Sequence, residues 1–389
     1  MIDFAGRWIT TFGPMILDQE KGYIRGTYGP DGIGCVIEGT IENGRYVFRY
    51  KEPAEEGTGW FVCTRYGRFA GEYLAEGAQK PCPWRGHREF DGLWVTSFGR
   101  LRLIQNADRV YGSYGGPGPS TLEGHVERGR LVFRYFEPKV NGTGWFELDA
   151  EQTGFYGQWQ PDGGDTAGDW RGVRAHALPG LRWLIVLEAP WQCSLTDPEF
   201  AFGAMLRELF ARVSGVEVRQ RSFQDEPSLL HWAREIQYIA EPVVLVIAGH
   251  GEPPGLSVQG RIIDSRKIVD ALRSADDLAL LHFSACLIGQ DAGQALAGAP
   301  FAVSGYTTSV DWAQSALIEF IYLDMILEKG LSPSRAAEHL TRLVGFAGDA
   351  ALADSPYRPA GFRFFNPLPE SMQPQPLKIS SLLADWMRK

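Results

Sequence analysis

A short stretch, VVLVIAGHG at residues 243–251, decides the fold of the second half of the chain. Its first six residues are apolar without interruption, which is typical of a strand buried on both faces of a sheet. Further apolar runs occur at residues 184–187 and 278–281, and segments with helical periodicity separate the runs. Strands that alternate with helices predict an α/β domain with a mostly parallel sheet.

The pattern predicts the bounds of these elements. We expect strands at 184–187, 216–223, 243–248, 278–284 and 301–304, and helices at 197–213, 228–239, 265–273, 291–296 and 312–327. The segments 251–261 and 345–359 are predicted as loops that contact substrate or are processed.

A histidine and a cysteine directly follow two successive predicted strands. His250 comes after strand 243–248, and Cys286 comes after strand 278–284. The carboxyl ends of parallel strands meet at one edge of a sheet, so the two side chains should be neighbours. An imidazole beside a thiol raises the thiolate fraction and later protonates a leaving group. Gly251 leaves room for its N–H and that of Cys286 to face a developing oxyanion.

The stretches 243–251 and 280–289 resemble the His-Gly and Ala-Cys motifs of caspase-like cysteine peptidases. The closest similarity is to the bacterial branch related to separase and clostripain, often called CHAT peptidases, and it spans roughly residues 182–345. The resemblance implies a caspase-like α/β fold and a cysteine endopeptidase that acts on proteins or peptides. By this resemblance His250 is the general acid/base, Cys286 is the nucleophile, and the backbone of Gly251 and Cys286 forms the oxyanion hole. No cofactor or metal is expected.

The residues that would bind the substrate side chain before the scissile bond, P1, are less well defined. Ser284 occupies the position of a glutamine in classical caspases, and we identify no basic residues that would bind an aspartate at P1. In the separase-like branch, an acidic side chain after the fifth strand binds a basic P1 residue. The comparable segment here offers Tyr306, Ser309 and Asp311 as candidates. Asp311 is also placed to cap the helix at 312–327, and both roles stay open.

Structural roles are the alternative for each of these residues. A single buried cysteine or histidine is usually a packing residue, and only the joint placement of the pair favours catalysis. A second hypothesis is therefore a non-catalytic interaction protein whose caspase-like half is a scaffold. His282 is expected in the core, Cys193 is expected to be structural, and Glu252 is expected to be exposed.

The first half of the chain is a duplicated unit. DFAGRW at residues 3–8 returns as EFDGLW at 89–94, and WRGHR at 84–88 returns as WRGVR at 170–174. The offset is 86 at both ends and 85 in the middle, for example where GTGWF at 57–61 returns at 142–146. Two copies of one fold follow from this repeat.

Each copy is predicted to be a small antiparallel β-barrel. Short runs with alternating aromatic and β-branched residues are separated by turn signals, which suits an up-and-down barrel of about eight strands. The Gly-x-Trp opening and Trp-x-Gly-x-Arg ending resemble barrels of the lipocalin and avidin type. Trp8, Trp60 and Trp84 are expected to fill the barrel ends as core, the alternative being a ligand or peptide pocket.

The sequence thus predicts two barrels at 1–88 and 89–175, a caspase-like domain at 181–368 and a C-terminal tail at 369–389, with a Pro-rich, linker-like stretch at 366–376. The barrels are expected to recruit a target or to regulate the peptidase through a partner or ligand. A net charge of -9 disfavours nucleic-acid binding. The start shows no secretory signal and no apolar run could span a bilayer, so a cytoplasmic protein without membrane partners is expected. The five cysteines show neither a disulfide nor a zinc pattern.

Overall fold

The computed structural model describes residues 4–29, 34–65, 67–115, 120–192, 194–197, 200–291, 299–350 and 355–366. Cys193, the tail at 369–389 and most of the helix predicted at 291–296 lie outside the described residues. Contacts divide the chain into two compact units, of which the first ends at Ala175 and the second begins at His176.

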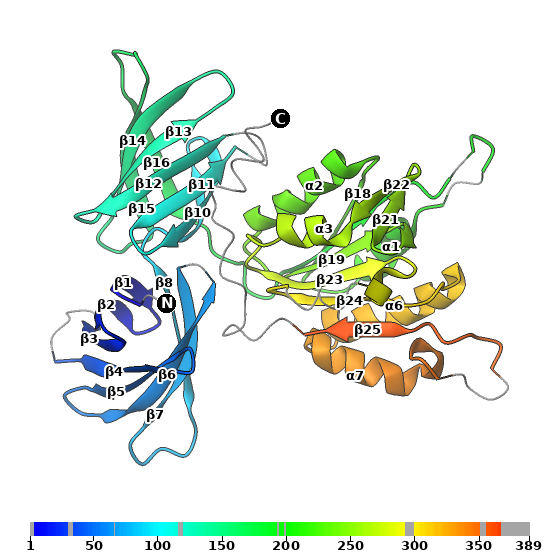
Figure 1. The fold of residues 1–389 in the computed structure, drawn as a ribbon, viewed down its shortest axis with the longest axis horizontal. Helices are drawn as coiled ribbons and strands as arrows, with labels where there is room; N and C mark the ends of the chain where they lie inside the picture. Colours follow the sequence, from blue (N-terminus) through cyan, green and yellow to red (C-terminus); the bar gives the residue numbers. More distant parts are fainter. Residues whose placement is uncertain are drawn as a thin grey trace. The chain divides into compact units, whose positions relative to one another are not determined.

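Each copy of the repeat forms a closed, eight-stranded antiparallel barrel, as predicted (Figure 1). The strands of the first barrel are β1 (Gly6–Thr10), β2 (Gly13–Glu20), β3 (Tyr23–Tyr28), β4 (Val36–Glu42), β5 (Arg45–Lys51), β6 (Glu56–Arg65), β7 (Arg68–Ala75) and β8 (Cys82–Arg88). Those of the second are β9 (Gly92–Thr96), β10 (Gly99–Asn106), β11 (Arg109–Tyr114), β12 (Thr121–Glu127), β13 (Arg130–Phe136), β14 (Asn141–Leu148), β15 (Gly154–Pro161) and β16 (Gly168–Arg174).

Corresponding side chains make the same contact in each barrel. The indole N–H of Trp8 donates to the carbonyl of Phe4 at 2.7 Å, and the guanidinium carbon of Arg88 lies 3.9 Å from the centre of the Trp8 ring. In the second barrel, Arg174 lies over Trp94 in the same way, at 4.2 Å. A cation over an indole face is attracted by the electrons of the ring. The Trp and Arg residues that recur in the two copies therefore form the same contact in each barrel.

Two of the three tryptophans predicted as core are confirmed. Trp8 and Trp84 are 1% and 2% exposed. Trp60 is a correction: it is only partly buried, with the guanidinium of Arg45 at 4.6 Å from its ring centre. Neighbouring residues of a strand point to opposite faces, and on β6 it is Phe61 that fills the interior, at 0% exposure.

The copies differ at one buried hydroxyl. In the first barrel, the Tyr50 hydroxyl donates to Glu55 at 2.6 Å. The equivalent Tyr135 is 3% exposed, and among the described residues its hydroxyl has no hydrogen-bond partner. Val140 occupies the place of Glu55 in the second copy, at the same offset of 85, which removes the acceptor. A buried hydroxyl without a partner costs stability.

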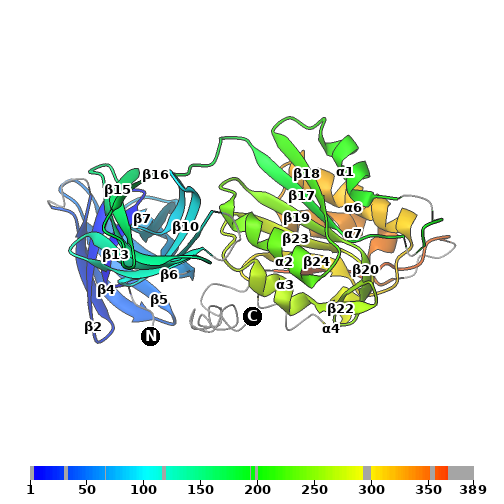
Figure 2. The same cartoon turned by 90° about the horizontal axis from the view of Figure 1, so that it is seen from above.

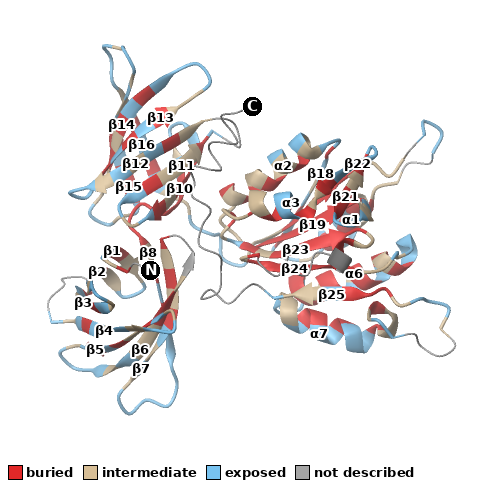
Figure 3. Ribbon diagram, in the orientation of Figure 1, coloured by how far each residue is buried: buried red, intermediate tan, exposed pale blue. Residues whose placement is uncertain are grey.

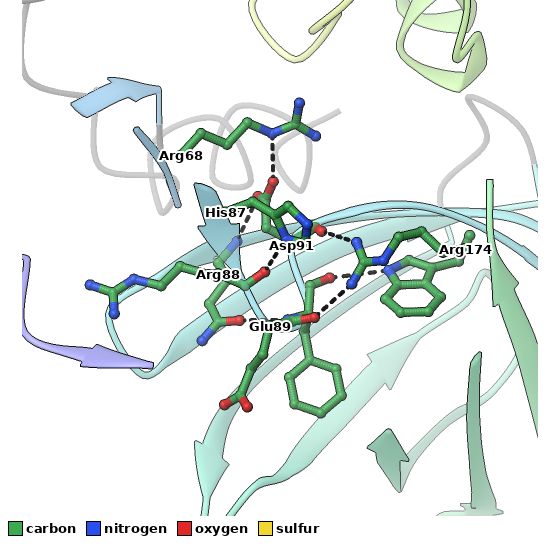
Figure 4. A network of polar contacts seen from close by, with 9 residues as sticks. Arg68, His87, Arg88, Glu89, Asp91 and Arg174 are labelled. Atoms are coloured by element: carbon green, nitrogen blue, oxygen red, sulfur yellow. Dashed lines mark hydrogen bonds and ion pairs between the residues drawn. The ribbon is translucent and has the colours of Figure 1, made fainter. Parts of the chain in front are cut away.

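A polar network joins the end of the first barrel to the start of the second (Figure 4). Arg68 donates to the carboxylate of Asp91 at 2.9 Å, and Arg174 donates to the Asp91 carbonyl at 2.6 Å. The Nδ1 atom of His87 lies 2.8 Å from the carbonyl oxygen of Arg88. Burial, reinforced by the positive charge of Arg174, lowers the pKa of His87 to about 4.

The second unit contains a six-stranded sheet in the order β18-β17-β19-β23-β24-β25. Its strands are β17 (Arg182–Glu188), β18 (Val216–Ser222), β19 (Val243–Ala248), β23 (Leu278–Ser284), β24 (Ala302–Tyr306) and β25 (Phe362–Phe365). All pair in parallel except β25, which is antiparallel to β24. The five predicted strands are confirmed, and β25 is an addition.

A small antiparallel sheet corrects the loop predicted at 251–261. It consists of β20 (His250–Glu252), β21 (Gly255–Val258) and β22 (Arg261–Asp264). Leu256, Val258 and Ile263 of this sheet are buried in the same apolar cluster as the second face of the main sheet. Each of its strands has only three or four residues, so its apolar runs are too short to predict a strand from the sequence.

Helices cover both faces of the main sheet, which gives three layers (Figure 2). Leu184 and Val186 of β17 pack with α1 (Phe202–Phe210), α6 (Trp312–Leu327) and α7 (Pro333–Leu343), whereas Ile185 and Leu187 pack with α2 (Glu226–Glu235) and α3 (Ser265–Ala271). This alternation explains the uninterrupted apolar strands, which are buried on both sides (Figure 3). The described helices are α1 (Phe202–Phe210), α2 (Glu226–Glu235), η1 (Ile236–Tyr238), α3 (Ser265–Ala271), α4 (Ile288–Asp291), α6 (Trp312–Leu327), α7 (Pro333–Leu343) and η2 (Gly345–Ala347).

The start of α1 corrects a prediction. The sequence places its cap at Asp197, but the helix begins at Phe202, and Asp197 instead accepts from the N–H of Ser194 at 2.8 Å. The N–H groups of Phe202 and Gly203 donate to the carboxylate of Glu188, at 2.5 and 3.0 Å. The end of the preceding strand, 14 residues before the helix, therefore supplies the cap, which no local capping motif could reveal.

Candidate functional site

The parallel pairing of β19 and β23 places the ends of both strands at one edge of the sheet. Ala248 pairs with Ser284, the last residues of the two strands. Gly249 extends the contact by donating its N–H to the carbonyl of Ser284 at 3.3 Å. His250 and Cys286 each follow these paired residues at the same distance along the chain, so both leave the sheet at this edge.

Gly251 brings the two segments into backbone contact. A Cβ atom at this position would lie 2.0 Å from the carbonyl oxygen of Cys286 and 2.9 Å from its nitrogen. No side chain fits in that space, because both obstacles are backbone atoms. The sequence predicts that a glycine is needed here for room, and the structure shows that the obstacle is the Cys286 backbone itself.

Cys286 is a free, partly buried cysteine in the turn between β23 and α4. The N–H of Val310 donates to its Sγ atom at 3.4 Å, and Sγ lies 3.6 Å from the Val310 carbonyl oxygen. Leu287 has a φ of 64°, in the left-handed region that a branched side chain rarely adopts. The chain therefore bends sharply just after the thiol, which faces the loop that precedes α6.

That loop is held in turn by the segment that precedes β25. The hydroxyl of Thr308 donates to the carbonyl of Ala360 at 2.7 Å, and the N–H of Thr307 donates to the carbonyl of Gly361 at 2.9 Å. The surroundings of the sulfur are thus built from β23, the loop before α6 and residues far along the chain.

His250 is exposed and begins β20. Its imidazole packs edge-on against the indole of Trp191, with ring centres 5.2 Å apart and planes at 73°. Trp191 lies in the loop directly after β17, and no role was predicted for it from the sequence. A signal existed: it follows a strand end at the same sheet edge as the histidine and the cysteine.

Glu188, also missed, is a buried carboxylate at the end of β17, 4% exposed. It accepts four hydrogen bonds: from the Trp191 indole at 2.6 Å, from the Gln220 side chain at 2.6 Å, and from the two N–H groups that begin α1. A buried charge is tolerated only when it is bonded in this way. Its one signal in the sequence is an acid that ends an apolar strand.

The three residues expected to contact substrate lie in different environments. Ser309 and Asp311 are exposed, and Asp311 accepts from the N–H of Gln314 at 3.0 Å as the cap of α6. Tyr306 is 1% exposed and donates its hydroxyl to Glu319 at 3.0 Å. Burial, and then the Glu319 carboxylate, raise the pKa of Tyr306 well above its usual value. Tyr306 therefore presents no surface to a substrate here.

His282 lies in the core, as predicted, at 0% exposure. Its Nδ1 atom is 2.8 Å from the hydroxyl of Ser304, and its Nε2 atom is 3.2 Å from the carboxylate of Glu319, which is also 0% exposed. The pair joins α6 to β23, the strand that leads into the turn with Cys286.

The remaining predicted residues lie outside the buried clusters described above. Glu252 is exposed, as expected. Cys35 and Cys63 are partly buried and Cys82 is exposed, so they are not the fully buried residues typical of cysteine.

In the part of the chain that the structure describes, no group of three or more His, Cys, Asp or Glu residues is arranged to hold a metal ion. None of the helices in the described ranges is long and apolar enough to cross a membrane.

Comparison with known proteins gives distant likenesses. No family model matches the chain, and neither does any curated protein. Among solved structures, caspase-1 from Spodoptera frugiperda is similar with a TM-score of 0.35 and 10% identity, over 48% of this chain and 88% of that one. Intact Ap-TbpB, with its N and C lobes, is similar with a TM-score of 0.16 and 10% identity, over 44% and 45% of the two chains. Scores this low carry no argument about fold or function.

Proposed function

We propose that the chain is a cysteine endopeptidase of caspase-like type, with His250 and Cys286 as its dyad. The observation that supports this most directly is the packing of Gly251 against the backbone of Cys286. It brings the residue after the histidine into contact with the cysteine at the edge where two parallel strands end. Functional residues of open α/β sheets gather at this edge.

The proposed reaction is acyl transfer. The Cys286 thiol gives its proton to His250, and the thiolate attacks the scissile carbonyl carbon to form a tetrahedral oxyanion. The N–H groups of Gly251 and Cys286 donate to that oxyanion. His250 returns the proton to the amine as the carbon–nitrogen bond breaks, which leaves a thioester on Cys286. Water, deprotonated by His250, hydrolyses the thioester. In the resting arrangement Sγ contacts the Val310 backbone, so attack also requires its release.

Digestion of a peptide library tests the proposal. Wild type is compared with Cys286→Ala and His250→Ala, and the cleaved peptides define the P1 residue. Loss of either dyad member should lower cleavage by at least about 10³-fold. The matched controls are Cys82→Ala and His231→Ala, which remove an exposed cysteine and an exposed histidine elsewhere. Both controls should retain activity.

A second readout covers an enzyme that needs activation. A thiol electrophile should label Cys286 faster than the other cysteines, and His250→Ala should slow that labelling. Cleavage that persists in Cys286→Ala would contradict the proposal. An unreactive Cys286 together with no cleavage would favour the alternative, a non-catalytic scaffold with the same architecture.

We further propose that the barrels recruit a target or regulate the peptidase through their outer surfaces. Their interiors are occupied by clusters of aromatic and aliphatic side chains, among them Trp84 and Phe61 in the first barrel. This favours a protein partner over a ligand within the barrel.

A further inference from the structure

We propose that Trp191, anchored by Glu188, is a positioning residue that holds the imidazole of His250 in the orientation needed to accept the Cys286 proton. The inference rests on the proposed function, because it assigns a role toward the same dyad. Three observations carry it: the contact between the two rings, the anchoring of the indole, and the surroundings of the imidazole.

The indole of Trp191 is held on more than one side. Its N–H donates to Oε1 of Glu188 at 2.6 Å, a short bond to a buried carboxylate. Its ring also packs edge-on against Phe200, with centres 5.7 Å apart. Phe200 in turn packs against Trp312, at 4.7 Å. The indole can therefore present its ring to His250 in one orientation only.

Glu188 is itself fixed by the main sheet and by α1. Gln220 of β18 and the first N–H groups of α1 donate to its two oxygens. The same carboxylate therefore ties two strands, one helix and the indole together. The position of the Trp191 ring is set relative to β17, and β17 is hydrogen-bonded directly to β19, the strand that leads into His250.

His250 has little else to orient it. It is exposed and lies on a strand of three residues at the sheet edge. Within the described ranges, neither of its ring nitrogens has a hydrogen-bond partner. General bases are usually oriented by a hydrogen bond from a third group. Here the ring contact with Trp191, at 5.2 Å, supplies the restraint on the imidazole.

The rate at which iodoacetamide alkylates Cys286 tests the inference without needing a substrate. The full-length protein is labelled between pH 5 and pH 9, and the peptide that contains Cys286 is quantified by mass spectrometry. We expect His250→Ala to slow labelling about tenfold at pH 7, because the imidazole that would accept the thiol proton is gone. Trp191→Ala should slow it about threefold to fivefold and shift the pH profile toward that of His250→Ala.

Further variants separate positioning from general structural damage. Trp191→Phe keeps an aromatic ring beside the imidazole and should retain at least about half of the wild-type rate. The matched control is Trp183→Phe, which removes an indole bond to Glu241, 3.1 Å long, at the opposite end of β17 and should change nothing. In the His250→Ala background, Trp191→Ala should have no further effect, since no imidazole remains to be positioned.

Three results overturn the inference. If Trp191→Ala labels like wild type while His250→Ala is slow, the dyad stands and the positioning role fails. If Trp191→Ala slows labelling equally with and without His250, the tryptophan acts on the cysteine by another route. If His250→Ala itself has no effect on the rate, the proposed dyad fails, and the positioning role fails with it.

Discussion

Protonation of His87 should destabilise the first unit below neutral pH, and the size of the effect follows from its surroundings. Burial and the positive charge of Arg174 lower its pKa from 6.5 to about 4, and Arg68 acts in the same direction. In the unfolded chain the imidazole takes up a proton near pH 6.5, whereas in the folded chain it stays neutral. The contribution of neutral His87 to the free energy of unfolding is therefore fully present above pH 6.5. It is lost progressively as the pH falls from 6.5 toward 4. Between pH 7 and pH 5 the loss is about 2 kcal/mol.

Urea-induced unfolding of the full-length protein measures this loss. His87→Gln removes the titrating group, and the difference in unfolding free energy between wild type and variant is taken at pH 7 and at pH 5. All other titrating groups cancel in this comparison. His125→Gln is the matched control, because the His125 side chain is 55% exposed in the same unit. The difference should change by about 2 kcal/mol for His87 and by clearly less for the exposed His125. Equal changes would refute the electrostatic reasoning.

Three further predictions concern single contacts. Gly251→Ala should lower the rates of both peptide cleavage and Cys286 labelling, because the Cβ of the alanine would overlap the Cys286 backbone. Wild-type rates for this variant in both assays would contradict the contact. Val140→Glu should stabilise the second barrel by about 1 kcal/mol in urea unfolding by giving the Tyr135 hydroxyl an acceptor, and it should do nothing in a Tyr135→Phe background. Arg174→Lys should destabilise that barrel by about 2 kcal/mol in the same assay, since an ammonium cannot bond the loop carbonyls and cover Trp94 together.

The sequence predicted the architecture well because repetition and apolar runs are strong signals. The two barrels follow from a repeat of about 86 residues, and strands 243–248 and 278–284 were predicted with the bounds that the structure shows. Buried strands read clearly, since both of their faces must be apolar. The same reasoning correctly placed His282 in the core and gave Asp311 a cap position.

The failures share a physical cause, which is that the deciding contact or strand register belongs to no local sequence motif. The cap of α1 comes from Glu188 on a strand, so the local signal at Asp197 misled. Trp60 has the aromatic character of a core residue, but strand register turns it outward under Arg45. Trp191 was missed because its place after a strand end is a weak signal by itself, and its ring contact with His250 is visible only in the structure.

The bonds from Thr307 and Thr308 to residues 360 and 361 have a consequence for biosynthesis. When the ribosome has just added Cys286, it must still add more than seventy residues before the carbonyl groups of residues 360 and 361 exist. Until then, the loop before α6, whose Val310 contacts the sulfur of Cys286, lacks the hydrogen bonds that hold it in place. The proposed nucleophile thus reaches its finished environment only late in translation, after the strands that flank it have been made.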